Sequence, residues 1–388
     1  MRQCDRRRVL HQHPHVEDLT NRVVLLSPRA PLTVARVVAK LDRGGAQLSL
    51  LRVASILARR GVTTRLLAGW ATPAGVALAR EHGFEPEVYG EGGNLQWVPD
   101  PGYADWLEPR LRNADAVHAH MFGGWWAAAG AIADGTPLIA SEHNAYLWPE
   151  RSYGRAIREA LPRVDRFYAH GPGARSTVLD AGLPDERLRS GISPVTGMGA
   201  LRLPGMPAGA VVFSGRLDRD KGPDLFLDAV ARLDARPPVF MLGAGRMELE
   251  LRAQRARLHL RRRVRMTGWL RDPAPTIAGA AVLVIPSRDE SFSQTAVLGM
   301  SLGIPVIGTD VDGFPATLGD GRGIIVPPED PVALAAAIDG VLAGRLRVDG
   351  DAARRFAERF EPERVAGIYE EAYRTLVGTP FDTAPVPA

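Results

Sequence analysis

Short apolar runs alternate with helical patterns along most of this 388-residue chain, and that alternation limits the possible folds more than any other feature. In the first half, apolar runs at 34–39, 62–67, 116–120 and 137–140 predict buried strands, and helical patterns ending near residues 60, 82, 133 and 161 follow them. Strands joined by helices pair in parallel, with helices on both faces of the sheet. The first half is therefore predicted to be α/β.

A second series of the same kind follows a break. The stretch from 191 to 207 is rich in proline and glycine, which is typical of a linker. Apolar runs at 211–213, 239–242, 264–266, 282–285 and 305–308 then predict a second parallel sheet. The fold class is therefore α/β with two doubly wound, Rossmann-like domains. Ligands of such sheets bind at the carboxyl ends of the strands, which here predicts an interdomain cleft.

The expected domain boundaries follow from these patterns. Residues 32–195 form the N-terminal domain, 196–207 the linker and 208–360 the C-terminal domain. Residues 361–378 form an amphipathic C-terminal helix that packs back toward the N-terminal domain. Residues 1–31 are expected to be a disordered extension and 379–388 a mobile tail.

The composition excludes several classes of protein. Hydrophobic residues make up 45% and charged residues 24%, as in soluble globular proteins. A net charge of +4 predicts weak attraction to anions and no nucleic-acid partner. The single cysteine, Cys4, excludes a disulfide framework. Neither an apolar run of about 18 residues nor a secretory signal is present, so a cytoplasmic location is expected and membrane contact is not favoured.

Lysine is scarce in this chain, and one lysine stands in a suggestive place. Of the 48 basic residues only Lys40 and Lys221 are lysines. Lys221 and Arg216 flank a polar loop between the strand at 211–213 and a helical pattern that begins at Pro223. A compact ammonium suits a phosphate in a tight pocket, and a helix N-terminus adds N–H donors. Chance is the competing explanation, and it is weakened by these neighbours.

Four loops are expected at the carboxyl edge of the second sheet. They are 215–222, the G-x-G turn 243–245, the segment 267–271, and the segment 286–295 that enters a helix. In the last loop, Glu290 precedes a helix N-terminus, where N–H groups can hold a diphosphate and the carboxylate can accept sugar hydroxyls. A capping role for Glu290 explains one loop by itself but not all four together.

These motifs resemble the retaining glycosyltransferases of the GT-B fold, glycosyltransferase family 4. That family has G-R-x(3–4)-K-G, then G-x-G, then P-S-x-x-E-x-F-G and G-x-P-V. This chain has Gly215-Arg216 with Lys221-Gly222, Gly243-Ala244-Gly245, Pro286-Ser287 with Glu290-Ser291-Phe292-Ser293, and Gly303-Ile304-Pro305-Val306. The resemblance covers about residues 33–375. It is looser in the first half, where the segments 44–47, 117–120 and 141–144 are similar to the family's cleft loops.

The resemblance implies a nucleotide-sugar donor in the C-terminal domain and an acceptor in the N-terminal domain. Arg216 and Lys221 would neutralise the departing diphosphate, Glu290 would hold sugar hydroxyls, and His143 would lie near the reacting carbon. His118 and His120 are as easily explained as hydrogen-bonded strand-end residues. The implied donor-binding residues are Gly44, Gly45, Gly215, Gly243, Gly245, Trp269, Ser291, Phe292, Ser293, Gln294 and Thr295.

One position departs from the family pattern. The family carries a second glutamate eight residues after the first, which binds the nucleotide ribose, and this chain has Leu298 there. A buried ribose hydroxyl without a partner costs about 1–3 kcal/mol. A 2′-deoxyribose donor, that is a dTDP-sugar, is therefore our hypothesis. A ribose held by backbone groups is an equal alternative, and a decayed site is a third.

No cofactor and no essential metal are expected. The D-x-D sequence at Asp310-Val311-Asp312 is a metal motif in another glycosyltransferase fold, but here it follows a predicted strand and precedes Gly313, so we interpret it as a turn. Trp125, Trp126, Tyr146 and Trp148 either stack on an acceptor or belong to the core or an interface.

The sequence therefore predicts a retaining glycosyltransferase acting on a small-molecule acceptor. The GC-rich residue usage and the hypothetical dTDP donor favour antibiotic assembly, for example dihydrostreptosyl transfer to an aminoglycoside. The alternatives are a cell-envelope lipid or polysaccharide glycosyltransferase, with residues 151–166 as a basic membrane-facing patch, and a catalytically degenerate GT-B partner protein.

Overall fold

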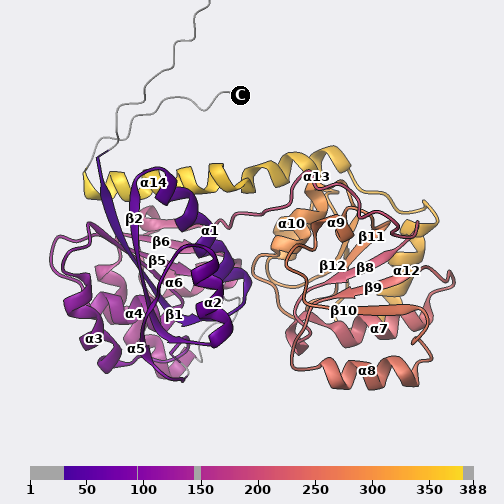
Figure 1. The fold of residues 1–388 in the computed structure, drawn as a ribbon, viewed down its shortest axis with the longest axis horizontal. Coiled ribbons are helices and arrows are strands. Elements are labelled where there is room, and N and C mark those ends of the chain that lie inside the picture. The colour runs from indigo at the N-terminus through magenta and orange to yellow at the C-terminus, as the bar shows by residue number, and fades with distance from the viewer. Residues whose placement is uncertain (1–29, 94, 144–149, 379–388) are drawn as a thin grey trace, which may run out of the picture.

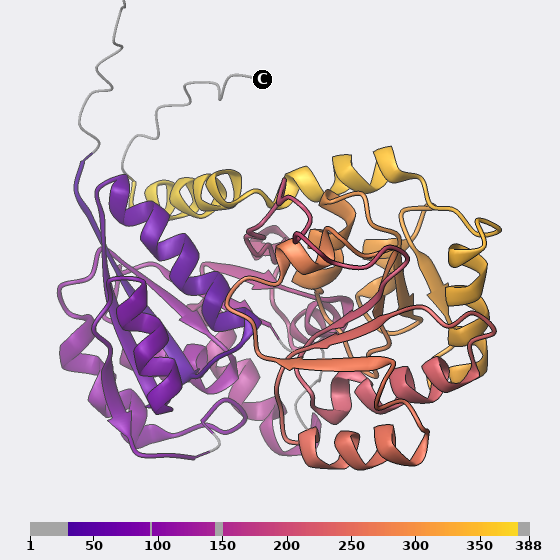
Figure 2. The same ribbon diagram turned by 45° about the vertical axis from the view of Figure 1, so that its right-hand side comes forward.

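The computed structural model describes residues 30–93, 95–143 and 150–378. Two α/β domains lie side by side, and a C-terminal helix runs along one side of the molecule from the second domain back over the first (Figure 1). The view turned by 45° shows the same arrangement (Figure 2). The predicted two-domain parallel α/β fold is confirmed. The expected extension and tail fall almost entirely outside the described residues.

The N-terminal domain contains a seven-stranded parallel sheet in the order β3-β2-β1-β4-β5-β6-β7. Its strands are β1 (Leu32–Leu41), β2 (Val62–Ala71), β3 (Glu87–Gly90), β4 (Ala116–His120), β5 (Leu138–Glu142), β6 (Arg166–Ala169) and β7 (Leu188–Ser190). Its helices are α1 (Gly45–Arg59), α2 (Pro73–Glu81), α3 (Pro101–Leu111), α4 (Phe122–Ala131), α5 (Glu150–Ala160) and α6 (Pro172–Asp180).

The C-terminal domain contains a six-stranded parallel sheet in the order β10-β9-β8-β11-β12-β13. Its strands are β8 (Val211–Ser214), β9 (Val239–Leu242), β10 (Val264–Gly268), β11 (Val282–Ile285), β12 (Val306–Thr309) and β13 (Ile324–Val326). Its helices are α7 (Pro223–Arg232), α8 (Glu248–Arg257), α9 (Ala274–Ile277), α10 (Gln294–Ser301), α11 (Phe314–Leu318), α12 (Pro331–Leu342) and α13 (Gly350–Ala357).

The central strands of the first sheet are apolar on both sides because helices cover both faces. Neighbouring residues of one strand enter different cores, as the period of two requires. Val117 and Phe167 join the core that contains α3 and α4. Ala116 and Tyr168 join the core that contains α14 (Pro362–Val377) and part of α1. The last helix is thus part of the N-terminal domain's packing.

The chain crosses between the domains twice, and the two crossings lie together. Residues 191–210 carry it forward without a helix or strand, and residues near 360 carry it back into α14. The Val195 N–H donates to the Phe360 carbonyl at 2.9 Å, and the Tyr369 hydroxyl donates to the Ile192 carbonyl at 2.8 Å. We call the side of the molecule where the two crossings lie together the hinge side.

A buried ion pair holds α14 in place. Glu370 and Arg374, at 0% and 2% side-chain exposure, pair at 3.0 Å, and Arg60, just beyond the end of α1, approaches Glu370 at 3.3 Å. Breaking a pair buried to this degree leaves an uncompensated charge, which costs about 3–5 kcal/mol. Among the described residues, no helix is both long and apolar enough to span a membrane.

Candidate functional site

The four predicted loops of the C-terminal domain meet, and backbone hydrogen bonds join them. Gly215 N–H donates to the Leu242 carbonyl at 3.0 Å, and Gly243 N–H donates to the Gly268 carbonyl at 2.9 Å. Arg288 N–H donates to the Asp220 carbonyl at 2.8 Å. Each bond joins segments that follow different strands. The loops therefore form one hydrogen-bonded platform at the carboxyl edge of the second sheet.

Two glycines allow the platform to close. Gly243 has φ +139°, and a Cβ there would lie 1.9 Å from the Gly215 carbonyl oxygen. Gly222 has φ +62°, and a Cβ there would lie 1.9 Å from the Pro286 carbonyl oxygen. Any other residue at either position would be strained and would also push a neighbouring loop away. The G-x-G and K-G motifs thus have a packing reason in addition to any role in ligand binding.

Lys221 and Glu290 form an ion pair at the centre of the platform. The Lys221 ammonium lies 3.1 Å from Glu290 Oε2 and 3.1 Å from the Asp289 carbonyl. Glu290 is 9% exposed, and its Oε2 also accepts from the Ser287 hydroxyl at 3.2 Å. The lysine therefore fixes the orientation of the carboxylate as well as supplying positive charge.

Arg216 stands at the mouth of the platform with carboxylate partners that sequence reasoning did not anticipate. Its guanidinium reaches Asp218 at 2.6 Å and Asp220 at 2.7 Å, and its side chain is half exposed. Both aspartates stand in the same loop as Arg216, two and four residues after it. An incoming anion must compete with two carboxylates for this guanidinium, so Arg216 is available only at an energetic cost.

The start of α10 presents free donors beside Glu290. Ser293 caps the helix, and its hydroxyl accepts from Ala296 N–H at 3.3 Å. The N–H groups of Ser293, Gln294 and Thr295 donate to no residue that the structure describes. Free N–H groups with the helix dipole behind them favour an anion. The helix begins at Gln294, two residues before the start predicted from the sequence. This start places the first turn directly after the Glu290 loop.

Residues of the N-terminal domain reach the same loop. The Ser291 hydroxyl donates to the His143 carbonyl at 2.7 Å, and the Gln294 amide donates to the Gly45 carbonyl at 2.9 Å. Gly44 precedes Gly45 at the start of α1. The predicted site residues of both domains therefore face one another across the cleft.

Two further contacts join the domains near this site. The Arg43 guanidinium lies 4.7 Å from the Trp269 ring centroid, and Trp269 is 46% exposed. Asp312 Oδ1 accepts from Gly173 N–H at 3.2 Å. The D-x-D segment is thus a turn, as expected, that also bridges to the N-terminal domain. Sequence reasoning did not anticipate either bridge.

His143 belongs to a column of four stacked imidazoles. Ring centroids lie 4.2 Å apart for His118 and His120, 5.4 Å for His120 and His143, and 4.1 Å for His143 and His170. The column ends at α14, where His118 Nδ1 lies 2.6 Å from the Tyr373 hydroxyl. The alternation His118-Ala119-His120 was the available signal, since residues two apart in a strand share a face.

Burial keeps this column uncharged. It lowers the pKa of His143 to about 4 and, with nearby Arg36 and His143, holds the pKa of His118 well below its usual range. Burial and neighbouring imidazoles do the same for His120 and His170. Near neutral pH, His143 is therefore a neutral imidazole able to donate or accept a hydrogen bond.

Trp125 and Leu298, two residues considered in the sequence analysis, lie in the cores of the two domains. Trp125 is fully buried and belongs to the N-terminal core, which is one of the two alternatives left open by the sequence. Leu298 is 6% exposed and packs in the C-terminal core near Gly197. Tyr146 and Trp148 lie outside the described residues. No group of three His, Cys, Asp or Glu side chains among the described residues is arranged to hold a metal.

Comparison with known proteins gives consistent matches. The family model "Glycosyltransferase Family 4" matches residues 43–190, and "Glycosyl transferases group 1" matches residues 208–344. A D-inositol 3-phosphate glycosyltransferase of Streptomyces avermitilis is 30% identical over 324 residues, covering 75% of this chain and 66% of that protein. D-inositol 3-phosphate glycosyltransferase 2 of Catenulispora acidiphila is 30% identical over 320 residues, covering 76% and 73%. The chain thus spans about two thirds of these relatives' length.

Solved structures show the same architecture. An Anabaena protein in complex with UDP has a TM-score of 0.73 at 19% identity, covering 89% of this chain and 100% of that one. The same Anabaena protein was also solved with UDP-glucose. Two Rossmann-like domains with facing loop platforms define the GT-B class of glycosyltransferases. This chain belongs to glycosyltransferase family 4. The expected family, fold and enzyme class are confirmed.

Proposed function

We propose that this enzyme transfers a sugar, with retention of configuration, from a nucleoside-diphosphate-sugar in the C-terminal platform to a hydroxyl of a small acceptor in the N-terminal domain. The observation that carries the proposal is the Lys221–Glu290 pair beside the free N–H groups of α10. Cations and free N–H groups suit a diphosphate, and a fixed carboxylate suits sugar hydroxyls. The His143 carbonyl accepts a hydrogen bond from the Ser291 hydroxyl at 2.7 Å. His143 would therefore face the sugar from the other domain.

Each charged group would act at a different stage. Negative charge grows on the diphosphate as the glycosidic bond breaks, and preorganised donors lower that barrier. Lys221 and the α10 N–H groups would take up this charge, with Arg216 joining when it exchanges its aspartate partners for the ligand. Removal of one such donor typically costs about 10²–10³ in kcat. No side chain is assigned as a nucleophile or general base.

A dTDP-sugar is the proposed donor. Leu298 offers no acceptor for ribose hydroxyls and packs among apolar side chains of the C-terminal core. A donor with one fewer ribose hydroxyl has one fewer group to satisfy. The Anabaena structure contains UDP, which makes UDP the natural competitor in a test of this proposal.

The acceptor we propose is a small polyhydroxylated ring carrying an anionic group, such as an inositol phosphate. The names of the relatives support this class. They give no support to the aminoglycoside acceptor or to antibiotic assembly, which remain predictions from residue usage and from the hypothetical dTDP donor.

Thermal melting with dTDP, UDP, GDP and ADP tests the donor platform. A nucleotide at about 100 times its Kd should stabilise the wild-type protein by about 2.7 kcal/mol. Lys221→Ala should lose this response, and Arg257→Ala, which alters an exposed arginine of α8, should keep it. Absence of stabilisation by all four nucleotides, or an equal response from Lys221→Ala, would refute the platform's role.

Leu298→Glu tests whether the donor site prefers dTDP or UDP. The new carboxylate is expected to shift the preference from dTDP toward UDP by about tenfold or more, because one charge-assisted hydrogen bond contributes about 1.5–3 kcal/mol. Relative Kd values measured by calorimetry give the answer, with Leu298→Met as the apolar control. Wild-type binding of UDP that is tighter than dTDP would exclude the dTDP proposal while leaving the platform intact.

A further inference from the structure

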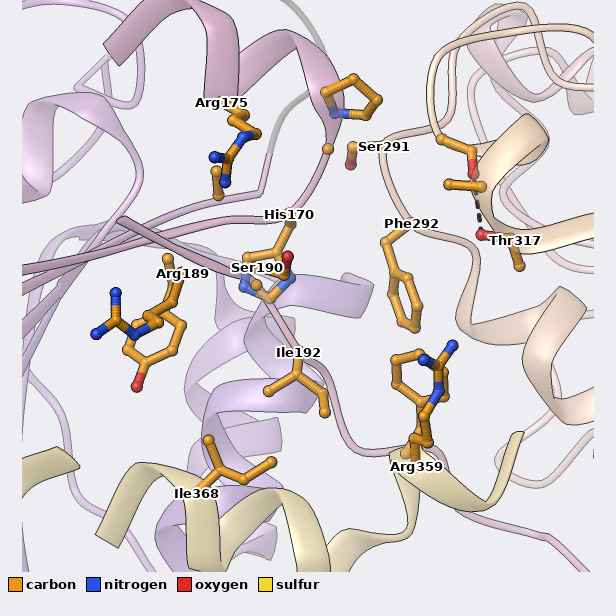
Figure 3. A pocket seen from close by; sticks show the side chains of 18 of the residues that line it. His170, Arg175, Arg189, Ser190, Ile192, Ser291, Phe292, Thr317, Arg359 and Ile368 are labelled. Atoms are coloured by element: carbon orange, nitrogen blue, oxygen red, sulfur yellow. Dashed lines mark hydrogen bonds between the residues drawn. The ribbon is translucent and has the colours of Figure 1, made fainter. Parts of the chain in front are cut away.

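A separate cavity of about 690 Å³ lies on the hinge side of the molecule. Arg216, Lys221 and Glu290 do not line it, although Ser291 and Phe292, which follow Glu290 in the chain, do. Its walls come from β6 with the start of α6, β7 with the first crossing, the loop at residues 291–292, the region of α11, residues 356–360, and α14. Figure 3 shows His170, Ser190 and Ile192 between Arg189 on one side and Phe292 with Arg359 on the other. The volume falls in the range of small-molecule sites.

The cavity is strongly basic. Arg166, Arg175, Arg189 and Arg359 line it, against a single acidic residue, Glu371. Of the four arginines, Arg175 alone forms an ion pair with a described carboxylate. Arg189 donates to backbone carbonyls at 2.7 and 2.8 Å, and Arg166 Nε is buried without a partner. Cations without counter-charges around one cavity favour an anionic occupant.

A buried imidazole adds an unmet hydrogen bond. His170 is 4% exposed, lines the cavity, and its Nε2 has no partner among the described residues. A buried polar atom without a partner is destabilising, so a ligand group that pairs with it regains the lost hydrogen-bond energy. The His170 ring also stacks on the His143 ring, with the two centroids 4.1 Å apart.

The remaining lining is apolar and aromatic. Phe292 and Phe360 have ring centroids 4.9 Å apart, and Ile192 also lines the cavity. Such rings offer faces to a flat apolar body. Arg359 lies on the same side as Phe292, whereas Arg189, the register partner of Tyr168, lies on the opposite side (Figure 3). The cavity thus has arginines on both sides and its phenylalanine rings on one.

Both domains build this cavity. Tyr168, His170 and Arg189 belong to the N-terminal domain, Phe292 and Thr317 to the C-terminal domain, and Ile192 and Arg359 to the two crossings. A ligand that touches both domains favours the arrangement in which both walls are in place. Its binding is then coupled to any other event that depends on the same arrangement.

We propose that this hinge-side cavity is a second ligand site, which binds a small anion, phosphate or carboxylate, carried on an aromatic or branched apolar body. The anion lies beside Arg166 and Arg189 of the neighbouring strands β6 and β7, and the body lies against Phe292 and Phe360 on the opposite side. Occupancy holds the two domains in the arrangement of this structure and fixes His170 against His143. The site goes beyond the transfer reaction, and its binding half does not depend on the proposed function.

Calorimetric titration at pH 7.5 with phenyl phosphate, inorganic phosphate and benzyl alcohol tests the binding half. Phenyl phosphate should bind with a one-to-one stoichiometry and at least tenfold tighter than either fragment. Arg166→Ala combined with Arg189→Ala should weaken it at least tenfold, and Ser190→Trp should abolish it by filling the cavity from strand β7. Arg257→Ala is the matched control for loss of an exposed arginine and should bind as the wild type does.

Lys221→Ala separates this cavity from the donor platform. Unchanged binding of phenyl phosphate by this variant supports the hinge site, and loss of binding would place the probe on the platform and overturn the proposal. Benzyl alcohol binding as tightly as phenyl phosphate, or a folded Ser190→Trp variant that binds normally, would also overturn it. Circular dichroism and the melting temperature establish that each variant is folded.

The coupling half rests on the proposed function and is measured separately. The Kd of the nucleoside diphosphate that binds best should change at least threefold at saturating phenyl phosphate, and the Kd of phenyl phosphate should change by the same factor in return. An unchanged nucleotide Kd would refute the coupling while the binding site stands. If no nucleotide binds at all, the proposed function fails, and the phenyl phosphate titration still decides the cavity.

Discussion

Mild acid should destabilise the N-terminal domain by charging the column of histidines. Burial lowers the pKa of His143 from 6.5 to about 4, and His118, His120 and His170 are shifted in the same direction. A group whose folded pKa is lower binds fewer protons when folded than when unfolded. Stability is therefore complete above pH 6.5 and is lost as the pH falls from 6.5 toward 4.

The size of this loss can be worked out for one member. A histidine with a pKa of about 4 folded and 6.5 unfolded loses about 2 kcal/mol of stability between pH 7.5 and 5.0. The other three add to the loss, although coupling within the column makes the total less than additive. Carboxylates with lowered pKa values, such as Asp42 and Asp224, lose their contribution only below about pH 4.5. Between pH 6.5 and pH 5, the loss of stability is therefore due to the histidines.

Urea unfolding followed by tryptophan fluorescence measures the effect in the right domain. Six of the seven tryptophans precede residue 150, so the signal reports mainly on the N-terminal domain. The midpoint at pH 5.0 should lie below that at pH 7.5 by at least the equivalent of about 2 kcal/mol. His259→Asn, which removes an exposed histidine with φ +58°, should keep the full pH dependence. An equal or higher midpoint at pH 5.0 would refute the assignment of a neutral, buried column.

Two substitutions test the packing of the platform and of α14. Gly243→Ala should cost more than about 1–3 kcal/mol, because a Cβ overlap adds to the strain at φ +139°, whereas Gly268→Ala, at φ +75° with open space, should show the strain alone; equal melting temperatures for the two variants would contradict the overlap. Glu370→Gln should cost about 3–5 kcal/mol by breaking the buried ion pair with Arg374. Its exposed neighbour Glu371→Gln should melt close to the wild type, and a similarly mild effect at Glu370 would show that the ion pair contributes little.

The sequence predicts the central strands well because they are continuous apolar runs. The predicted run 116–120 coincides with β4, and the last helix begins and ends where amphipathicity indicates. The misses are elements that lack such a run. β3 is short and exposed, with a glutamate at its start, and β6 begins with an arginine. α3 carries Pro109 inside the helix, which masks its pattern. α12 was missed although Asp330-Pro331 is a recognisable N-cap signal.

The parts of the site that lie within single loops were predictable from the sequence. The contacts between segments far apart in the chain were not. Lys221, Glu290 and the α10 turn are marked by motifs in single loops. The stacking of His143 on His170 depends on β5 and β6 being neighbours, which the sequence does not state. The Tyr373 contact to His118 joins residues 255 positions apart. The hinge-side cavity is harder still, because six separate segments build it.

The position of α14 has a consequence for the order in which the protein acquires its structure during translation. The core under β1 and β4 includes Val365, Tyr369 and Tyr373. Ribosomal synthesis releases the whole C-terminal domain before it releases these residues. The N-terminal domain, although it is synthesised first, therefore keeps an apolar face exposed until the last helix emerges. The C-terminal domain is synthesised second but can complete its folding earlier. Slowing translation after residue 360 should prolong that exposure and recruit chaperones to the N-terminal domain.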